Sequence, residues 1–370
     1  MYMIKSLLST CLLFLVVNSG AQIYINPGVD TTFKQVKVAL EFYNNYMADF
    51  KNKTIPDMKK YWPKNELQSR KVPDQSIYMF DDYPLYSQGY IPTIIYIRPT
   101  DKYVQIKTQL SSVDSLKHIM TMDVFNYYVA FDKHYHPYFI NPLTANLAKW
   151  PTRKLRNVTF YYPPHYQFNR EKAGKLIKQI VSLESVWGLQ AINIRYYLTT
   201  DNDELYKLVG FDYALLMGNK LKPSGKSDGI DNQVFCSGWG EDYFHEVVHL
   251  YLNHLFPKSP LQEGLAVFYG GSMGHNIEWH LKRVNQYLID HPKVDLTDID
   301  NFWYKDPYTN PGSAIEGMIC NMAYQKGGLS GLKRLMEYTS FNDIFINEFG
   351  ITRTQINSFL RKAISDEARR

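Results

Sequence analysis

Five consecutive residues, His245-Glu246-Val247-Val248-His249, combine side chains that can hold a metal ion with one that can activate water. In an α-helix, positions four apart share one face, so the two imidazoles can bind the same ion. Glu246 stands beside the first histidine and can reach a water molecule on that ion. This is the arrangement for metal-assisted hydrolysis, usually with zinc. The pattern is short, and two histidines on an ordinary helix are the alternative explanation.

A catalytic zinc needs a third protein ligand and an open position for water. A histidine six residues after His249 is absent, because that position is Leu255. His254 lies about 140° round a helix from His249 and is better explained as a surface or core histidine. Glu263 is the better candidate, because Ser259-Pro260-Leu261-Gln262 has the form of a helix start just before it. An exposed helix glutamate is the alternative explanation for Glu263.

Neighbouring elements must position these residues. One helix, predicted over Asp242 to Phe256, carries both histidines, and a second short helix carries Glu263. We expect Gly264 to let these two helices approach closely. The polar stretch 219–232 is predicted to be a loop. Gln233 to Cys236 is predicted to be a short strand, and it could be the sheet edge that holds an extended peptide by main-chain hydrogen bonds.

Further elements precede this site. Asn169 is predicted to cap a helix that reaches Trp187, with Gly188 just past its end. Apolar alternation and periodicity predict the elements on either side of that helix, which are strands at Val158 to Tyr162 and Ile192 to Leu198 and a short helix at Asp203 to Val209. Strands and helices in this order predict an α+β fold.

The N-terminal part is predicted to be a separate small α+β domain over 22–150. Apolar spacing predicts a helix from residue 33 that Pro56 breaks or ends. Four strand-like stretches follow, at Thr93 to Arg98, Tyr103 to Leu110, Ile119 to Phe131 and Tyr135 to Ile140. Residues 141–151 are predicted to form a linker. A helix followed by these strands resembles the cone-shaped domains of the nuclear-transport-factor-2-like kind, in which a helix lies on a curved antiparallel sheet.

Residues 1–21 have the form of a secretory signal. Lys5 gives a positive start, Leu7 to Val17 is a short apolar core, and small residues end at Ala21, where cleavage is expected. The apolar run is too short to span a bilayer comfortably, and no later segment reaches that length. The sequence therefore predicts a secreted or periplasmic protein without stable membrane insertion.

The charge and the cysteine content of the chain limit the kinds of partner and covalent bond to be expected. The chain has 370 residues and a formal net charge of +5, but its basic residues are scattered, so no nucleic-acid surface is expected. Cys236 and Cys320 remain after cleavage of the signal. In an oxidising compartment they could pair, or they could be two buried thiols. The oligomeric state is not predicted.

Over Asn157 to Met336 the sequence resembles the gluzincin metallopeptidases, in particular the short, secreted, thermolysin-like kind called peptidase MA-like. Besides the strands and helices already described, the resemblance rests on His245 to His249, on Glu263-Gly264-Leu265-Ala266, and on Tyr308 through Gly312-Ser313-Ala314 into the helix to Gly328. It implies a zincin-like catalytic domain over 151–370, with a mixed sheet, an active-site helix and a mostly helical C-terminal part.

The resemblance also implies roles for single residues. His245, His249 and Glu263 would bind one catalytic Zn²⁺, and Glu246 would pass the proton of the activated water to the leaving amine. The tetrahedral oxyanion needs a donor besides the metal, and the family points to a tyrosine or histidine on the C-terminal side. Tyr308 is preferred. The other candidates are Tyr304, Tyr269, His275 and His280.

These observations predict an exported zinc peptidase that acts on a peptide or protein substrate. The alternative is a catalytically silent binding protein that keeps the zincin fold. Glu246 favours catalysis, because a zinc-binding scaffold has no need for a carboxylate there. The sequence does not identify the substrate, and residues 22–150 could be an inhibitory or substrate-docking module.

Overall fold

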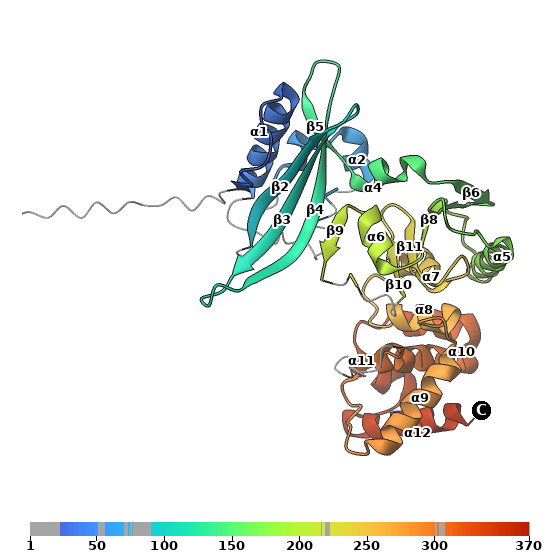
Figure 1. Ribbon diagram of the computed structural model, residues 1–370. Helices are drawn as coiled ribbons and strands as arrows, with labels where there is room; N and C mark the ends of the chain where they lie inside the picture. Colours follow the sequence, from blue (N-terminus) through green and yellow to red (C-terminus); the bar gives the residue numbers. More distant parts are fainter. Residues whose placement is uncertain are drawn as a thin grey trace, which may run out of the picture.

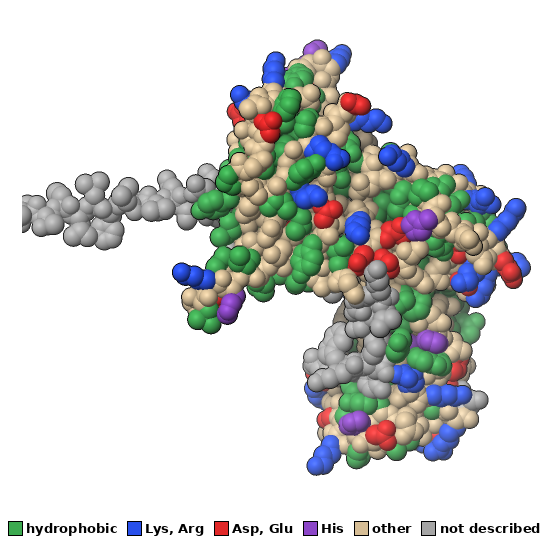
Figure 2. Space-filling model, in the orientation of Figure 1, with side chains coloured by type: hydrophobic (Ala, Val, Ile, Leu, Met, Phe, Trp, Pro, Cys, Tyr) green, Lys and Arg blue, Asp and Glu red, His purple; other side chains and the backbone are tan. Residues whose placement is uncertain are grey.

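The computed structural model describes residues 23–50, 56–69, 73–74, 76, 90–215, 217–218, 223–299, 302 and 308–369. The predicted signal and Tyr304 lie outside these residues. The fold is α+β, as predicted, with strands in two mixed sheets, helices packed beside them, and a mainly helical last third of the chain (Figure 1). No helix in the described ranges is long and apolar enough to cross a membrane. On the face drawn in Figure 2, Lys and Arg side chains are scattered and form no continuous patch.

The first sheet has the order β1-β2-β3-β4-β5, and β9 also pairs with β4. Its strands are β1 (Tyr24–Ile25), β2 (Ile91–Pro99), β3 (Val104–Val113), β4 (Ile119–Phe131), β5 (Pro137–Ile140) and β9 (Phe211–Ala214). All neighbours are antiparallel except β1 and β2. The four predicted strands are confirmed.

Helix α1 (Lys34–Asp49) packs on this sheet and buries Val36, Tyr43 and Met47 against it. It ends earlier than predicted, because Phe50 leaves the helical conformation and turns into the core before Pro56 is reached. A 3-10 turn (Met58–Lys60) and α2 (Lys64–Ser69) follow.

Most of the predicted linker at 141–151 is helical. Helix α4 (Pro142–Asn146) is followed by a 3-10 turn (Leu147–Lys149). The Asn141 side chain accepts the Leu143 N–H at 3.0 Å, and Pro142 occupies the first helical position. Both are ordinary helix-start features.

Two carboxyl groups are fully buried in the core beneath α1. Asp74 accepts hydrogen bonds from the hydroxyls of Tyr46 at 2.6 Å and Tyr127 at 3.1 Å. Asp123, on β4, has no hydrogen-bond partner for either carboxylate oxygen within the described part of the chain. Burial, reinforced by the charge of Asp74, raises the pKa of Asp123 from its ordinary value of 3.8 to about 8.

Asp123→Asn is therefore expected to stabilise the protein at pH 8 and to change little near pH 4. The folded state binds this proton more tightly than the unfolded state, so the contribution of Asp123 is fully present below about pH 4 and is lost as pH rises toward 8. About four pK units correspond to at most about 5 kcal/mol. Urea unfolding of both proteins at pH 4, 6 and 8 checks this, and parallel pH profiles would contradict it.

The second sheet has the order β10-β11-β8-β7-β6. Its strands are β6 (Thr152–Leu155), β7 (Val158–Tyr161), β8 (Ile194–Thr199), β10 (Ser224–Asp228) and β11 (Gln233–Ser237). The three inner strands are parallel, and each outer strand is antiparallel to its neighbour. Helix α5 (Arg170–Trp187) packs on the sheet, capped by Asn169 and ended by Gly188 at φ 68°, as predicted. Helix α6 is Asn202–Leu208.

The edge of this sheet differs from the prediction. The stretch 219–232 was expected to be a loop, yet β10 lies within it, and β11 is an interior strand with both sides paired. The prediction that Gln233 to Cys236 could hold a peptide at the edge is therefore wrong. The sequence of β10, Ser-Gly-Lys-Ser-Asp, carries no apolar alternation. It forms a strand because it pairs with β11. The pattern of residues within β10 does not reveal this pairing.

Side chains from both sheets pack in one hydrophobic core. Phe211 of β9, which comes after the predicted boundary at 150, lies in the same core cluster as α1 and the first sheet. Tyr197 of β8 and Phe235 of β11 stack with ring centroids 5.0 Å apart and join that cluster. Residues on both sides of the predicted boundary thus contribute to one core.

The chain beyond β11 is mainly helical. Its helices are α7 (His245–Leu252), a 3-10 turn (Asn253–Leu255), α8 (Gln262–Gly270), α9 (Ile277–Asp290), α10 (Pro311–Met336), α11 (Phe341–Asp343), a π-helical turn (Ile344–Glu348), a 3-10 turn (Arg353–Gln355) and α12 (Ile356–Ala368). Helix α10 is kinked at Gly327 and Gly328. Cys236 and Cys320 are both buried free thiols.

Candidate metal site

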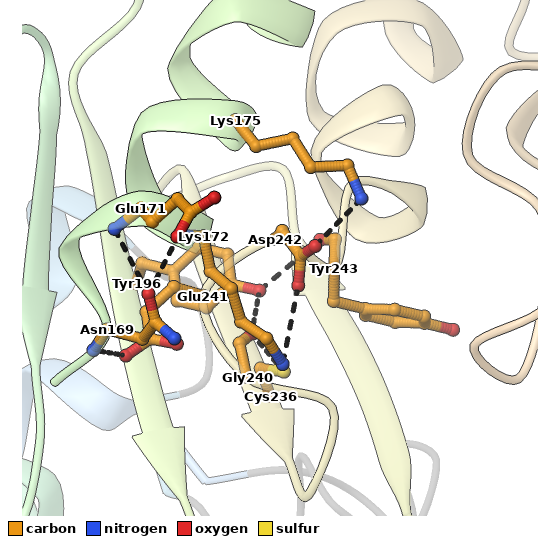
Figure 3. A network of polar contacts seen from close by, with 10 residues as sticks. All are labelled: Asn169, Glu171, Lys172, Lys175, Tyr196, Cys236, Gly240, Glu241, Asp242 and Tyr243. Carbon is orange, nitrogen blue, oxygen red and sulfur yellow. Dashed lines mark hydrogen bonds and ion pairs between the residues drawn. The ribbon is translucent and has the colours of Figure 1, made fainter. Parts of the chain in front are cut away.

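Helix α7 begins at its first histidine, later than the predicted Asp242. The segment before it is held by α5 and β8 (Figure 3). The Tyr196 hydroxyl donates to the carbonyls of Gly240 at 3.1 Å and Tyr243 at 3.3 Å. The Lys175 ammonium lies 2.9 Å from the Asp242 carboxylate. These contacts fix the backbone that leads into α7, and thereby the place where the first imidazole enters the site.

The structure brings together the three residues predicted as ligands. The Nε2 atoms of His245 and His249 lie 3.2 Å apart. Glu263 Oε2 lies 3.4 Å from His245 Nε2, and its Oε1 lies 3.2 Å from His249 Nε2. One donor atom from each residue can be chosen so that all lie within 4.8 Å of one another. Two imidazoles and one carboxylate are a common ligand set for a catalytic zinc with an open position.

Hydrogen bonds through Nδ1 orient both imidazoles. His245 Nδ1 donates to the Gly271 carbonyl at 2.7 Å, and His249 Nδ1 donates to the Asn253 side-chain oxygen at 3.1 Å. Because both acceptors are oxygens, each Nδ1 carries the hydrogen and each Nε2 lone pair is left for a metal. Such outer hydrogen bonds set the tautomer and ring orientation of metal-binding histidines.

Burial and charge oppose each other in this site. The His245 and His249 side chains are 6% and 8% exposed, whereas the Glu263 side chain is 56% exposed. Burial lowers the pKa of His249, but Glu263 and Glu246 outweigh it and leave this pKa raised. Burial raises the pKa of Glu263, but the two histidines outweigh it and leave this pKa lowered. The nearby carboxylates thus favour positive charge at the point where the donors meet.

Helix α8 places Glu263 in its first turn, as predicted, but the predicted cap is wrong. Leu261 is the residue before the helix and makes no side-chain cap. The Ser259 hydroxyl accepts the Leu261 N–H at 3.3 Å, which forms a turn before the helix. Gln262 donates to the Phe256 carbonyl at 2.8 Å and does not close a capping box. The Ser-Pro pattern therefore marks the turn, and the helix starts after it.

Two glycines allow close helix contacts, and only one was noted in the sequence. Gly264 was expected to face α7, but it abuts α10, where a Cβ would lie 2.5 Å from Glu316 Cβ. The glycine against α7 is Gly270, where a Cβ would lie 2.7 Å from His245 Cα. The Gly270-Gly271 pair at the end of a short apolar helix was the available signal for this contact.

Glu246 is buried, with 7% of its surface exposed, and it is not among the converging donors. It faces the edge strand β10. A Cβ at Gly225 would lie 2.6 Å from Glu246 Oε1 and 2.5 Å from Tyr243 Cε1. Any larger residue at 225 would therefore displace the carboxylate or the phenol.

A cavity of about 410 Å³ is lined in part by the three converging residues and Glu246. Other parts of its wall come from β10, from Tyr243 and Met273, and from the start of α10 at Asn310 and Ser313. Tyr243 was missed by the sequence analysis. Its position two residues before the first histidine was the available signal.

None of the predicted oxyanion donors that the structure describes lines this cavity. Tyr308 is 46% exposed and is not among the described residues that line this cavity. Tyr269 and His275 line a neighbouring cavity of about 680 Å³. His280 is buried and bonds to Thr309 and to the Ser272 carbonyl. His254 is exposed and away from the site, as expected.

In comparisons with known proteins, no family model, no curated protein and no solved structure matches this chain.

Proposed function

We propose that this protein is an exported zinc-dependent peptidase of the gluzincin kind, with a zincin-like catalytic domain in its C-terminal part. The observation that carries the proposal is the convergence of His245, His249 and Glu263 with a buried, non-coordinating Glu246 in one cavity. Their donor set suits zinc, because two neutral imidazoles and one carboxylate leave a position for water.

Zinc at this point would lower the pKa of a bound water toward neutrality and polarise a peptide carbonyl. Glu246 would accept the water proton and deliver it to the leaving amine. The hydrogen bonds at Nδ1 keep both imidazoles turned toward the metal point. Tyr308 remains the predicted oxyanion donor, and Tyr243 is a second candidate because it lines the cavity.

The edge strand β10 supports a peptide as the substrate. Residues 224–227 line the cavity, and within the described sheet β10 has a partner on one side only. An extended peptide can add to such an edge through main-chain hydrogen bonds. The absence of a side chain at Gly225 leaves room for the side chains of Glu246 and Tyr243 beside this edge.

The alternative is a zincin-fold protein that binds zinc and a partner without turnover. Burying a carboxylate is unfavourable unless it is compensated. Glu246 is as buried as the histidines and is not among the three converging donors. A role in proton transfer gives a reason for its position, and this favours the enzyme.

The test is metal addition and removal on the protein without residues 1–21. We expect one zinc ion per chain and cleavage of a peptide library that stops with a chelator and returns with zinc. Zinc content by elemental analysis and cleavage products by mass spectrometry are the measurements. Stoichiometric zinc without any cleavage would favour the binding protein, and no zinc binding would overturn both functions.

A further inference from the structure

A buried carboxylate next to the metal site has no part in the ligand set. Glu316 lies on α10 and is 9% exposed. Its Oε2 accepts the backbone N–H of Gly264 at 3.0 Å. Gly264 directly follows Glu263, so this hydrogen bond holds the peptide unit that joins the third ligand to the rest of α8.

Helix α8 needs this acceptor. The first N–H groups of a helix have no partner within it, and Leu261 supplies no side-chain cap. Glu316 provides an acceptor from another helix, and its negative charge is favourable near a helix N-terminus. The absence of a side chain at Gly264 makes the contact possible, since a Cβ there would lie 2.6 Å from the Glu316 backbone carbon.

Glu263 is the ligand that depends most on its backbone. The two histidine side chains are enclosed, and each is hydrogen-bonded from behind through Nδ1. The Glu263 side chain is 56% exposed, and its recorded polar contacts are to those same histidines. Packing encloses less of this side chain than of the two imidazoles, so its direction depends more on the position of its backbone.

We propose that Glu316 is a positioning residue that holds Glu263 on the metal point through the Gly264 amide. The inference rests on the proposed zinc site. Outer hydrogen-bond partners of metal ligands typically change metal affinity by about 10–100-fold when they are removed. A loss in that range is expected when Glu316 can no longer accept the Gly264 N–H.

Three substitutions in the protein without residues 1–21 test this. Glu316→Leu removes the acceptor and keeps a similar volume, and we expect zinc affinity to fall about 10–100-fold. Glu316→Asp keeps the charge but shortens its reach, and we expect a loss in the same direction. Glu316→Gln keeps an acceptor oxygen at the same reach, and we expect it to restore zinc affinity to within a few-fold of the wild type.

Glu348→Leu is the matched control. Glu348 is also a buried carboxylate of the helical part, and its oxygens bond Arg334 at 2.7 and 2.9 Å. Its removal should lower the unfolding temperature in chelator and leave the zinc affinity of the folded protein unchanged. Zinc dissociation constants come from competition with a chromophoric chelator, and unfolding in chelator is recorded for every variant.

The outcomes separate this inference from the proposed function. Weaker zinc binding by folded Glu316→Leu or Glu316→Asp, with rescue by Glu316→Gln, supports it. Wild-type zinc affinity in these two variants, or a loss equal to that of Glu348→Leu, overturns it while the zinc site stands. If Glu316→Leu does not fold, Glu316→Asp against Glu316→Gln decides. A wild type that binds no zinc overturns both proposals.

Discussion

Glu246→Gln is expected to abolish peptide cleavage and to leave one zinc ion bound per chain. Glutamine keeps the size of the side chain, so it fits the same space against β10. It cannot accept a proton from water, and the loss of a general base typically costs 10²–10⁴-fold in rate. Zinc should be retained, because Glu246 is not among the three converging donors.

The measurement is kcat/KM on the best peptide from the library, together with zinc content by elemental analysis. Glu171→Gln is the control, because Glu171 is an exposed glutamate in the first turn of α5. This variant should cleave the peptide at the wild-type rate. Undiminished cleavage by Glu246→Gln would remove it as the base. Loss of zinc from this variant would mean that it acts as a ligand.

The convergence of His245, His249 and Glu263 could be predicted from the sequence because each part has a local signal. The spacing of His245 and His249 needs only the helical period. Glu263 needed a recognisable turn before a short helix, and the Ser-Pro pattern supplied it even though the helix begins later than predicted. The strands and caps around α5 follow from patterns within a few residues for the same reason.

The surroundings of these three residues could not be predicted, because they depend on contacts between distant segments. Strand β10 is polar and forms by pairing with β11, so its own sequence predicts a loop. The partner of Gly264 is a residue of α10 far along the chain, and the neighbour of Gly270 is the backbone of α7. A glycine shows that something approaches closely, but the sequence does not say what approaches.

The two tyrosine candidates differ in how far the sequence can reveal them. The prediction of Tyr308 rests on its place in the sequence before the helix at Gly312. Tyr243, which does line the cavity, stands on the segment that Tyr196 and Lys175 hold against the sheet and α5. Its direction is therefore set by residues that lie far away in the sequence.

Glu263→Ala is expected to remove the effect of zinc on stability. A ligand that binds only the folded state stabilises it by about 2.7 kcal/mol at one hundred times its dissociation constant and about 4.1 kcal/mol at one thousand times. Two imidazoles alone leave the metal without its charged ligand. We therefore expect zinc affinity to fall more than about 100-fold, beyond the range for outer partners, and the zinc-dependent rise in unfolding temperature to disappear.

The comparison in chelator makes this prediction specific. The Glu263 side chain is more than half exposed and makes its recorded polar contacts with the two histidines, so its removal should change the metal-free unfolding temperature little. Glu278→Ala, at an exposed glutamate in the first turn of α9, should keep the full zinc effect. If Glu263→Ala still gains the wild-type stabilisation from zinc, the histidines bind the ion with another residue, and the carboxylate beside them is only their counter-ion.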